Sequence, residues 1–189
     1  ESGPRRLWQI PVGEGHAGPA VFDGRVFLLD YLETEQADAL RCFSLDDGAE
    51  IWRRAYPAPK KRNHGFSRTV PAVTGRHVVS LGPQGQALCV EMATGAFRWG
   101  LDLVAACGAK VPYWYTGQCP LLDGEIAVLA PAGPDTLLMG VRCETGEVAW
   151  RTPNPGGWTM SHASVMPMVL HGRRQYVYAA IGGVAGVSA

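Results

Sequence analysis

The sequence predicts an all-β fold, a β-propeller built of four-stranded antiparallel blades. Three observations predict it: a short phrase recurs along the chain, a second marker recurs in step with it, and turn-forming residues are frequent. Glycine occurs 24 times and proline 14 times in 189 residues, so few segments are long enough for a helix. The apolar fraction of 47% nevertheless indicates a packed core. Short strands joined by tight turns satisfy both facts.

The recurring phrase places a glycine four residues before a tryptophan. It reads "DDGAEIW" at Asp46–Trp52, "ATGAFRW" at Ala93–Trp99 and "ETGEVAW" at Glu144–Trp150. Trp8 in "RRLWQIP" extends the series, and the successive tryptophans are 44, 47 and 51 residues apart. A repeat of this length is typical of a propeller blade, which carries four short strands.

The first strand of each unit follows a proline and ends at a two-residue turn. The second residue of that turn is a glycine, as in Asp23-Gly24, and it supplies the positive φ that tight hairpin turns require. The second strand comes directly after it. The four prolines are Pro19, Pro71, Pro120 and Pro167, and the other three turns are Thr74-Gly75, Asp123-Gly124 and His171-Gly172.

The third strand of each unit reads "ALRCFSL", "ALCVEM" or "LLMGVRC" and leads into the repeated phrase. Gly48, Gly95 and Gly146 are expected to be left-handed in the turn before the fourth strand. That strand alternates polar and apolar residues, as an outer strand with one solvated face does. We expect each tryptophan of the phrase to pack against the next blade and to bury on the order of 200 Å² there.

Charge and cysteine content exclude several classes of function. The formal net charge is zero, which argues against a nucleic-acid-binding protein, and the basic run from Lys60 to Arg62 is short enough to be a solvated loop. No apolar run is long enough to span a membrane, and no signal peptide is recognisable. The five cysteines show no CxxC spacing, and Cys42 and Cys89 are interpreted as small core residues.

The glycine-to-tryptophan phrase, repeated at blade spacing, resembles the tryptophan-docking repeat of PQQ-like β-propellers, the pyrroloquinoline quinone or quinoprotein type. The segments "HGFSRTVPAV", "WYTGQCPLL" and "YVYAAIGGVAGVSA" are similar to the same bacterial family. The resemblance implies an exported protein, periplasmic or secreted. It also implies one of two kinds of member: a quinoprotein dehydrogenase, or a scaffold such as the one in the outer-membrane barrel-assembly machine.

The repeat divides the chain into blades at 12–56, 65–103 and 112–153, a partial blade at 162–189 and a lone outer strand at 5–11. About four blades are therefore covered, and the resemblance implies a larger propeller, of eight blades in the quinoproteins. The alternative is that Leu7–Pro11 completes the last blade by strand exchange, within one chain or between two copies of a homo-oligomer. An open blade edge is seldom left exposed.

Candidate binding residues lie in the loops that enter the first strand of each blade, which surround the channel on one face. These loops are Gly13–Gly18, Asn63–Arg68, Pro112–Gln118 and Thr159–Ser164. Loops on a rigid scaffold commonly carry binding groups, whereas the turns of the opposite face are plain hairpins. The ligand-binding candidates are His16, His64, Arg68, Trp114, Tyr115, Gln118 and His162.

Three interpretations of these loops stay open. Trp114 or Tyr115 would stack on a planar ligand such as PQQ, with Arg68 and the histidines facing its carboxylates; His16, His64 and His162 would bind a metal; or all these side chains would only brace the loops. The residues that hold calcium beside PQQ in quinoprotein enzymes are not evident, because Glu14 is the only carboxylate in the four loops and Ca²⁺ takes several oxygen ligands, and no metal ligand is assigned. The vicinal cysteines of quinoprotein enzymes are also missing.

The sequence thus favours a scaffold or binding protein of unassigned activity, which takes a protein partner or a small ligand at the channel face. The alternative is a fragment of a PQQ-dependent dehydrogenase, so enzymatic activity and the cofactor stay open. No catalytic residue is assigned. The repeat residues Trp8, Trp52, Trp99, Trp150, Gly48, Gly95 and Gly146 are expected to be structural.

Overall fold

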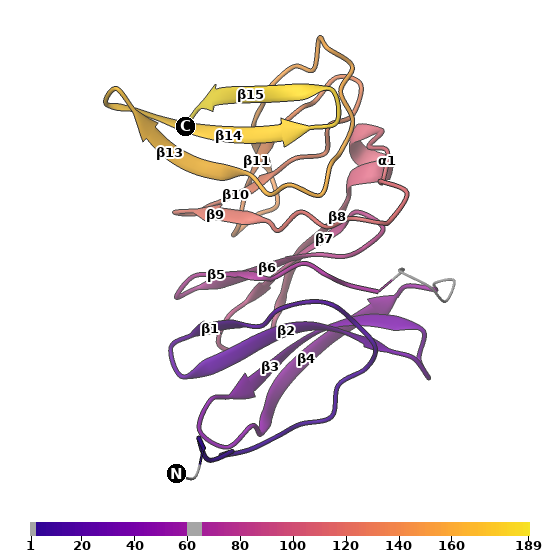
Figure 1. Ribbon diagram of the computed structural model, residues 1–189, viewed down its shortest axis with the longest axis vertical. Coiled ribbons are helices and arrows are strands. Elements are labelled where there is room, and N and C mark those ends of the chain that lie inside the picture. The colour runs from indigo at the N-terminus through magenta and orange to yellow at the C-terminus, as the bar shows by residue number, and fades with distance from the viewer. Residues whose placement is uncertain (1–2, 60–65) are drawn as a thin grey trace.

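The structure, a computed structural model, describes residues 3–59 and 66–189. Its antiparallel sheets are stacked one on another along the long axis of the molecule (Figure 1). Within the described residues there are three four-stranded sheets and a last sheet of three strands. Strands follow one another in chain order within every sheet. This is the all-β propeller architecture that the repeat predicts.

Each sheet is a blade, and the strand bounds follow the sequence units. Blade 1 holds β1 (Ala20–Phe22), β2 (Arg25–Leu32), β3 (Ala37–Ser44) and β4 (Glu50–Pro57). Blade 2 holds β5 (Ala72–Val73), β6 (His77–Leu81), β7 (Gln86–Glu91) and β8 (Phe97–Asp102), and the short helix α1 (Leu103–Cys107) follows it. Blade 3 holds β9 (Leu121–Asp123), β10 (Ile126–Leu129), β11 (Met139–Arg142) and β12 (Val148–Arg151). Blade 4 holds β13 (Met166–Leu170), β14 (Arg173–Ala180) and β15 (Gly183–Ser188).

The hairpin turns between the first two strands agree with the sequence prediction at three of four places. Gly24, Gly124 and Gly172 have φ of 67°, 58° and 73°. Gly75 does not adopt a positive φ among the described residues. There Thr74 makes the turn instead: its backbone N–H donates to the carbonyl of His77 at 2.9 Å, and its hydroxyl accepts from the His77 N–H at 3.1 Å.

The turn glycines of the repeated phrase are left-handed, as predicted, with φ of 74°, 68° and 77° at Gly48, Gly95 and Gly146. A β-bulge follows each of these turns. Cys42 pairs with Trp52 while its neighbour Phe43 pairs with Glu50, so one residue of β4 has no partner. The residues left over in this way are Ile51, Arg98 and Ala149, each directly before a tryptophan.

The bulge aims the tryptophan at the next blade, because an extra residue bends the strand and increases its twist. The indole Nε1 of Trp52 donates to the Met92 carbonyl at 3.0 Å, and that of Trp99 donates to the Cys143 carbonyl at 2.9 Å. A Cβ added at Gly95 would lie 2.6 Å from the Trp52 indole. Glycine is therefore required at this position for close approach as well as for its φ.

The N-terminal segment reaches blade 1 in the same way. The Trp8 indole donates to the Leu45 carbonyl at 2.6 Å and lies against Gly48. Residues 5–11 are nevertheless not a β-strand, which differs from the predicted lone outer strand. No described strand pairs with this segment in a sheet, although the Arg41 side chain of β3 donates to the Pro11 carbonyl at 3.4 Å. The tryptophan position is thus occupied while the strand pairing is not formed.

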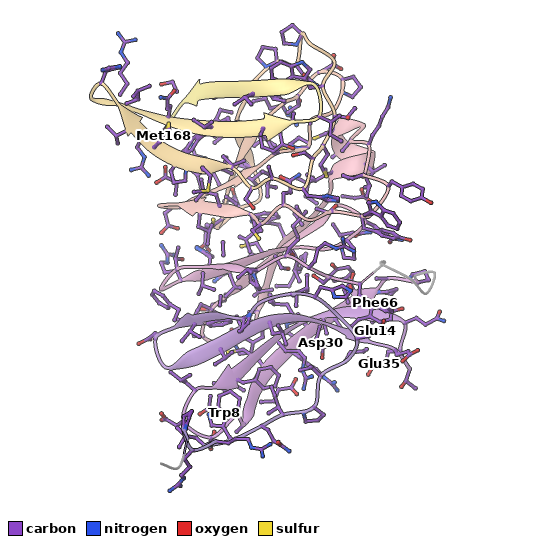
Figure 2. All side chains as sticks on the ribbon, viewed as in Figure 1. Trp8, Glu14, Asp30, Glu35, Phe66 and Met168 are labelled. Carbon is purple, nitrogen blue, oxygen red and sulfur yellow. The ribbon has the colours of Figure 1, made fainter. Side chains whose placement is uncertain are left out.

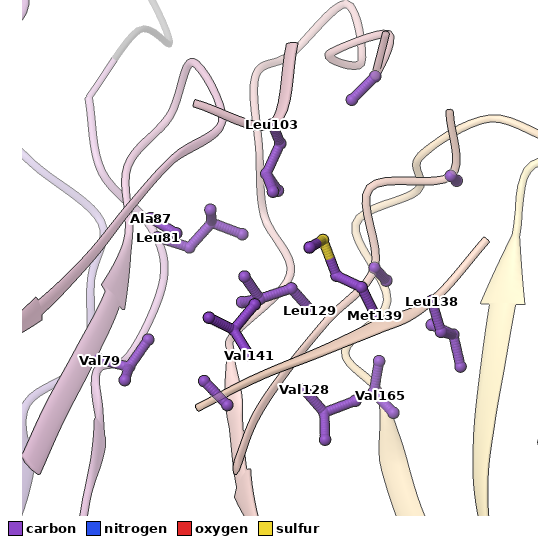
Figure 3. Close-up of a cluster of buried hydrophobic side chains, with 14 of the residues drawn as sticks. Val79, Leu81, Ala87, Leu103, Val128, Leu129, Leu138, Met139, Val141 and Val165 are labelled. Carbon is purple, nitrogen blue, oxygen red and sulfur yellow. The ribbon is translucent and has the colours of Figure 1, made fainter. Parts of the chain in front are cut away.

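The core lies between the blades. One buried cluster joins blades 2, 3 and 4 and includes Leu81, Leu129 and Met139, all less than 2% exposed (Figure 3). A smaller cluster joins blades 1 and 2. The innermost strands also contact one another from blade to blade, β1 with β5 and β5 with β9. Their shared side is the channel side of the fold.

The two ends of the blades differ in character. One end, the turn face, carries the hairpins between first and second strands and the turns of the repeated phrase. The other end, the loop face, carries α1 and the long connections between blades, and it lies on the right in Figure 1. Glu14 and Phe66 lie on the loop face, while Met168 lies toward the turn face (Figure 2).

Candidate functional site

The predicted candidate residues that the structure describes lie on the loop face, in connections that hydrogen-bond from blade to blade. His16 donates its backbone N–H to the Ser67 carbonyl at 2.9 Å. The backbone N–H of Val70 donates to the Cys119 Sγ at 3.2 Å, and the backbone N–H of Cys119 donates to the Ser164 Oγ at 2.9 Å. Each connection is therefore tied to the next one. Together they form a continuous rim along the loop face.

Tyr115 and His162 are brought into contact at the centre of this rim. Tyr115 has a φ of 66°, an uncommon conformation for a residue with a side chain. A ring nitrogen of His162 hydrogen-bonds the Tyr115 carbonyl at 2.8 Å. A Cβ at Gly117 would lie 2.9 Å from the His162 ring, so glycine makes room for the imidazole. Strained backbone of this kind is concentrated at binding sites, where the surrounding contacts hold it.

Two aromatic side chains project from the same loop. Tyr113 is 86% exposed and Trp114 is 47% exposed. Their rings meet edge to face, with centroids 4.6 Å apart and an interplanar angle of 88°. Exposed aromatic groups are costly in water and are enriched at interfaces. This pair is the most prominent aromatic surface on the rim.

The remaining candidates are placed differently. His16 and His162 are exposed, and Arg68 is half-buried. Gln118 is 1% exposed and donates its amide to the Ala130 carbonyl at 2.8 Å, so it braces the loop from within. His64 lies outside the described residues.

Sequence reasoning missed Trp158. Unlike the tryptophans of the repeated phrase, Trp158 has no glycine four residues before it. This difference was the only sign in the sequence that Trp158 lies outside the repeat. Its backbone N–H donates to Asn154 Oδ1 at 3.1 Å and its carbonyl accepts from Asn154 Nδ2 at 2.8 Å. The indole packs over Gly182 and Gly183, at the turn between β14 and β15. Asn154 is 5% exposed, so this anchor is well protected from water.

Trp158 separates two hollows on the loop face. One, of about 310 Å³, is almost wholly apolar and is lined by Leu137, Pro153, Pro155, Trp158, Ala185 and Val187. The other, of about 220 Å³, is lined by Lys110, Ala132, Pro134 and Trp158 among others. The first is large enough for a bulky apolar side chain from another molecule. Apolar hollows with a few polar groups at the edge are typical binding sites.

Two buried polar side chains, Asp38 and Tyr56, lie close together at the loop-face end of blade 1. Asp38 is fully buried, and the Tyr56 side chain ends near it beside Gly82. Burial, and then the Asp38 charge, hold the pKa of Tyr56 well above its usual range. The phenol therefore stays protonated at physiological pH, and its role here is structural.

The described residues do not fit a quinone–metal site. Among residues 3–59 and 66–189, no group of three or more His, Cys, Asp or Glu side chains is placed to hold a metal ion. The Tyr115 carbonyl and the Gln118 amide already have partners within the protein. Within the same residues no helix is both long and apolar enough to cross a bilayer.

Comparison with known proteins identifies the family of this chain. Residues 36–189 match the family described as outer membrane protein assembly factor BamB, a PQQ-like repeat family. The chain belongs to this family. A sequence comparison with curated proteins finds no match.

Solved structures agree on the fold. BamB from Moraxella catarrhalis superimposes with a TM-score of 0.59 at 16% identity, over 96% of this chain and 49% of that one. Quinohemoprotein alcohol dehydrogenase from Comamonas testosteroni gives 0.52 at 17% identity, over 75% and 21%. The computationally designed Ika4 protein gives 0.60 at 10% identity, over 98% of both chains. The chain spans about half the length of the BamB structure. At these identities the likeness concerns the fold alone.

Proposed function

We propose that this member of the BamB family is a non-catalytic scaffold that binds a protein partner through its loop face. The observation that carries the proposal is the set of tryptophans outside the repeat. Trp114 and Trp158 take no part in the repeated phrase, and both lie on the loop face. Trp114 is exposed beside Tyr113, and Trp158 lines an apolar hollow. Aromatic anchors next to a pocket are the usual centre of a protein–protein interface.

The family supports this proposal and its location. A family described by outer membrane protein assembly favours an extracytoplasmic protein, periplasmic or secreted, whose partner takes part in that assembly. In the same proposal, the repeated tryptophans serve as the tryptophan-docking motif that holds neighbouring blades together.

A homo-oligomer formed by blade completion stays a prediction. Blade 4 has three described strands, and its exposed apolar side chains include Met166, Val169 and Val184. A dehydrogenase role has less support, because the described part of the loop face lacks a group of metal ligands. The Gln118 amide and the Tyr115 carbonyl on that face also hydrogen-bond within the protein.

Site-specific photocrosslinking in the native bacterium tests the proposal. A photoreactive phenylalanine analogue replaces Tyr113 in one variant and Phe97 in a matched control. Phe97 is an aromatic residue that is 63% exposed at the start of β8, toward the turn face. We expect one discrete crosslinked protein from position 113 and none from position 97.

Two further arms sharpen the result. Trp158→Ala combined with the probe at position 113 should reduce the crosslinked product several-fold, because the apolar hollow that Trp158 lines on the same face is lost. A titration of the purified chain with PQQ and Ca²⁺, followed by absorbance, checks the alternative. Equal crosslinking from positions 97 and 113, or saturable PQQ binding that Trp114→Ala abolishes, would contradict a scaffold-only role.

A further inference from the structure

Two buried cysteines meet between blade 2 and blade 3. Cys89 lies in β7 and Cys143 directly follows β11, and both side chains are fully buried. The Cys89 Sγ donates to the Cys143 carbonyl oxygen at 3.5 Å, so the Cys89 thiol lies directly against Cys143. They belong to facing surfaces of neighbouring sheets. The contact therefore joins two blades rather than two strands of one blade.

The repeat shows that this pairing is specific to one interface. Cys42 is six residues before Gly48, as Cys89 is six before Gly95, so the two cysteines occupy equivalent positions. Cys143 is three residues before its turn glycine, and the equivalent residue in blade 2 is Met92. The carbonyls of both accept from a repeat tryptophan, Trp99 for Cys143 and Trp52 for Met92.

At the interface between blades 1 and 2, the equivalent positions therefore hold Cys42 and Met92. At the interface between blades 2 and 3, they hold Cys89 and Cys143. A thioether fills this position of the core equally well at the first interface, where Met92 is 5% exposed. Packing alone therefore does not require a second thiol at position 143. The sequence analysis interpreted Cys42 and Cys89 as small core residues, and so missed the pair of Cys89 with Cys143.

We propose that Cys89 and Cys143 are a redox site, a pair of thiols that a small disulfide compound oxidises to a covalent bond between blades 2 and 3. One protein thiolate attacks a sulfur of the oxidant and expels the other sulfur as a thiolate, which leaves a mixed disulfide on the protein. The second protein thiolate then attacks the protein sulfur of that mixed disulfide and expels the remaining half. The oxidant is reduced to two thiols, and the protein loses two hydrogen atoms.

The environment distinguishes the two sulfurs. The hydrogen bond from Cys89 lowers the pKa of Cys143, while that hydrogen bond and burial raise the pKa of Cys89. This direction favours the thiolate at Cys143 over that at Cys89. Glu144 follows Cys143 and pairs with Arg98 at 3.0 Å across the same interface, which holds the turn in place.

Burial sets the rate of the reaction. A disulfide requires the sulfurs to approach to about 2 Å, and the oxidant must first reach them. We expect oxidation to be slow in the closed protein and at least several-fold faster in urea below the unfolding transition, where the blade interface opens.

The experiment treats the reduced chain with oxidised glutathione, with and without urea, then alkylates the remaining thiols and maps the peptides by mass spectrometry. We expect a crosslinked peptide joining positions 89 and 143, and a urea midpoint above that of the reduced chain. Cys42→Ser should leave the crosslink intact. Cys89→Ser should abolish it and leave the Cys143 mixed disulfide with glutathione.

A gain-of-function variant protects the test against a variant that fails to fold. Met92→Cys places a thiol opposite Cys42 and should create a second crosslink, between blades 1 and 2, in addition to the natural one. The proposal is overturned if the natural pair stays reduced in urea while Cys107 and Cys119 become glutathionylated. It is overturned equally if position 89 crosslinks to all the other cysteines in similar yield.

Discussion

The interface between blades 2 and 3 and the interface between blades 3 and 4 are built differently. In the first, Trp99 is 7% exposed and its indole N–H donates to the Cys143 carbonyl of the next blade. In the second, Trp150 is only partly buried and stacks on Tyr176, with ring centroids 5.8 Å apart and 12° between the planes. The same phrase thus makes two kinds of contact.

The difference shows what the phrase needs from its neighbour. The acceptor of the Trp99 indole is the Cys143 carbonyl, in the turn that follows β11 of blade 3, whereas the Trp150 indole N–H donates no hydrogen bond within the described residues. Polar contacts there come from another place: Asp123 of blade 3 accepts from Tyr176 Oη and pairs with Arg174, both at 2.6 Å. A repeated tryptophan is thus equivalent in sequence, while its contacts depend on the blade that follows.

Replacing the two tryptophans would test this contrast most strongly. Trp99→Ala should lower the free energy of unfolding by about 3–5 kcal/mol, because a large buried side chain and its hydrogen bond are lost. Trp150→Ala should cost about 2 kcal/mol, because the indole is less buried and no comparable carbonyl bond is lost. Urea unfolding followed by circular dichroism measures both. Equal losses would show that the two contacts are energetically alike.

Three glycines separate backbone strain from indole packing. Gly95→Ala should cost about 2–3 kcal/mol, since the added methyl meets the Trp52 indole and the φ of 68° is left-handed. Gly24→Ala has the same strain with open space around it and should cost about 1 kcal/mol. Gly75→Ala, which has neither strain nor close neighbours, should be near neutral. Thermal unfolding of the three variants, side by side, gives the order. A Gly95→Ala loss no larger than that of Gly24→Ala would contradict a packing requirement.

The smallest effect is expected from alkaline titration of Tyr176. Burial, and then the hydrogen bond to Asp123, raise the pKa of Tyr176 from 10 to about 12. The folded state therefore keeps its proton while the unfolded state loses it, and this contribution to stability is present below pH 10 and is lost between pH 10 and about 12. The drop in urea midpoint over this range should be smaller in Tyr176→Phe than in the natural chain. Parallel curves for the two proteins would argue against the shift.

The repeat predicted the blades well because it records contacts that recur. Gly48, Gly95 and Gly146 are all left-handed, and in each unit the indole of a repeat tryptophan packs against the turn glycine. The Thr74-Gly75 turn escaped prediction because the Thr74 hydroxyl offers the backbone an alternative to a positive φ.

The candidate site was harder to predict, because its loops do not repeat. Trp114 and His162 became candidates from their position in the loops, whereas Trp158 did not, since only the folded chain places it over Gly182 and between two hollows. The contact of Cys89 with Cys143 also depends on tertiary structure, because the two residues occupy different positions in their units.

The bulge before each tryptophan bears on how such a protein changes in evolution. A deletion of one residue at Arg98 would remove the bulge, and with it the bend and the additional twist that the bulge gives to β8 just before Trp99. Insertions in the loop face leave the bulge untouched, which agrees with tryptophan spacings of 44, 47 and 51 residues. A duplicated unit carries its own connector to the next one. Loop length can therefore vary from unit to unit, whereas the loss of a single residue inside the phrase would disturb the contact between a blade and its neighbour.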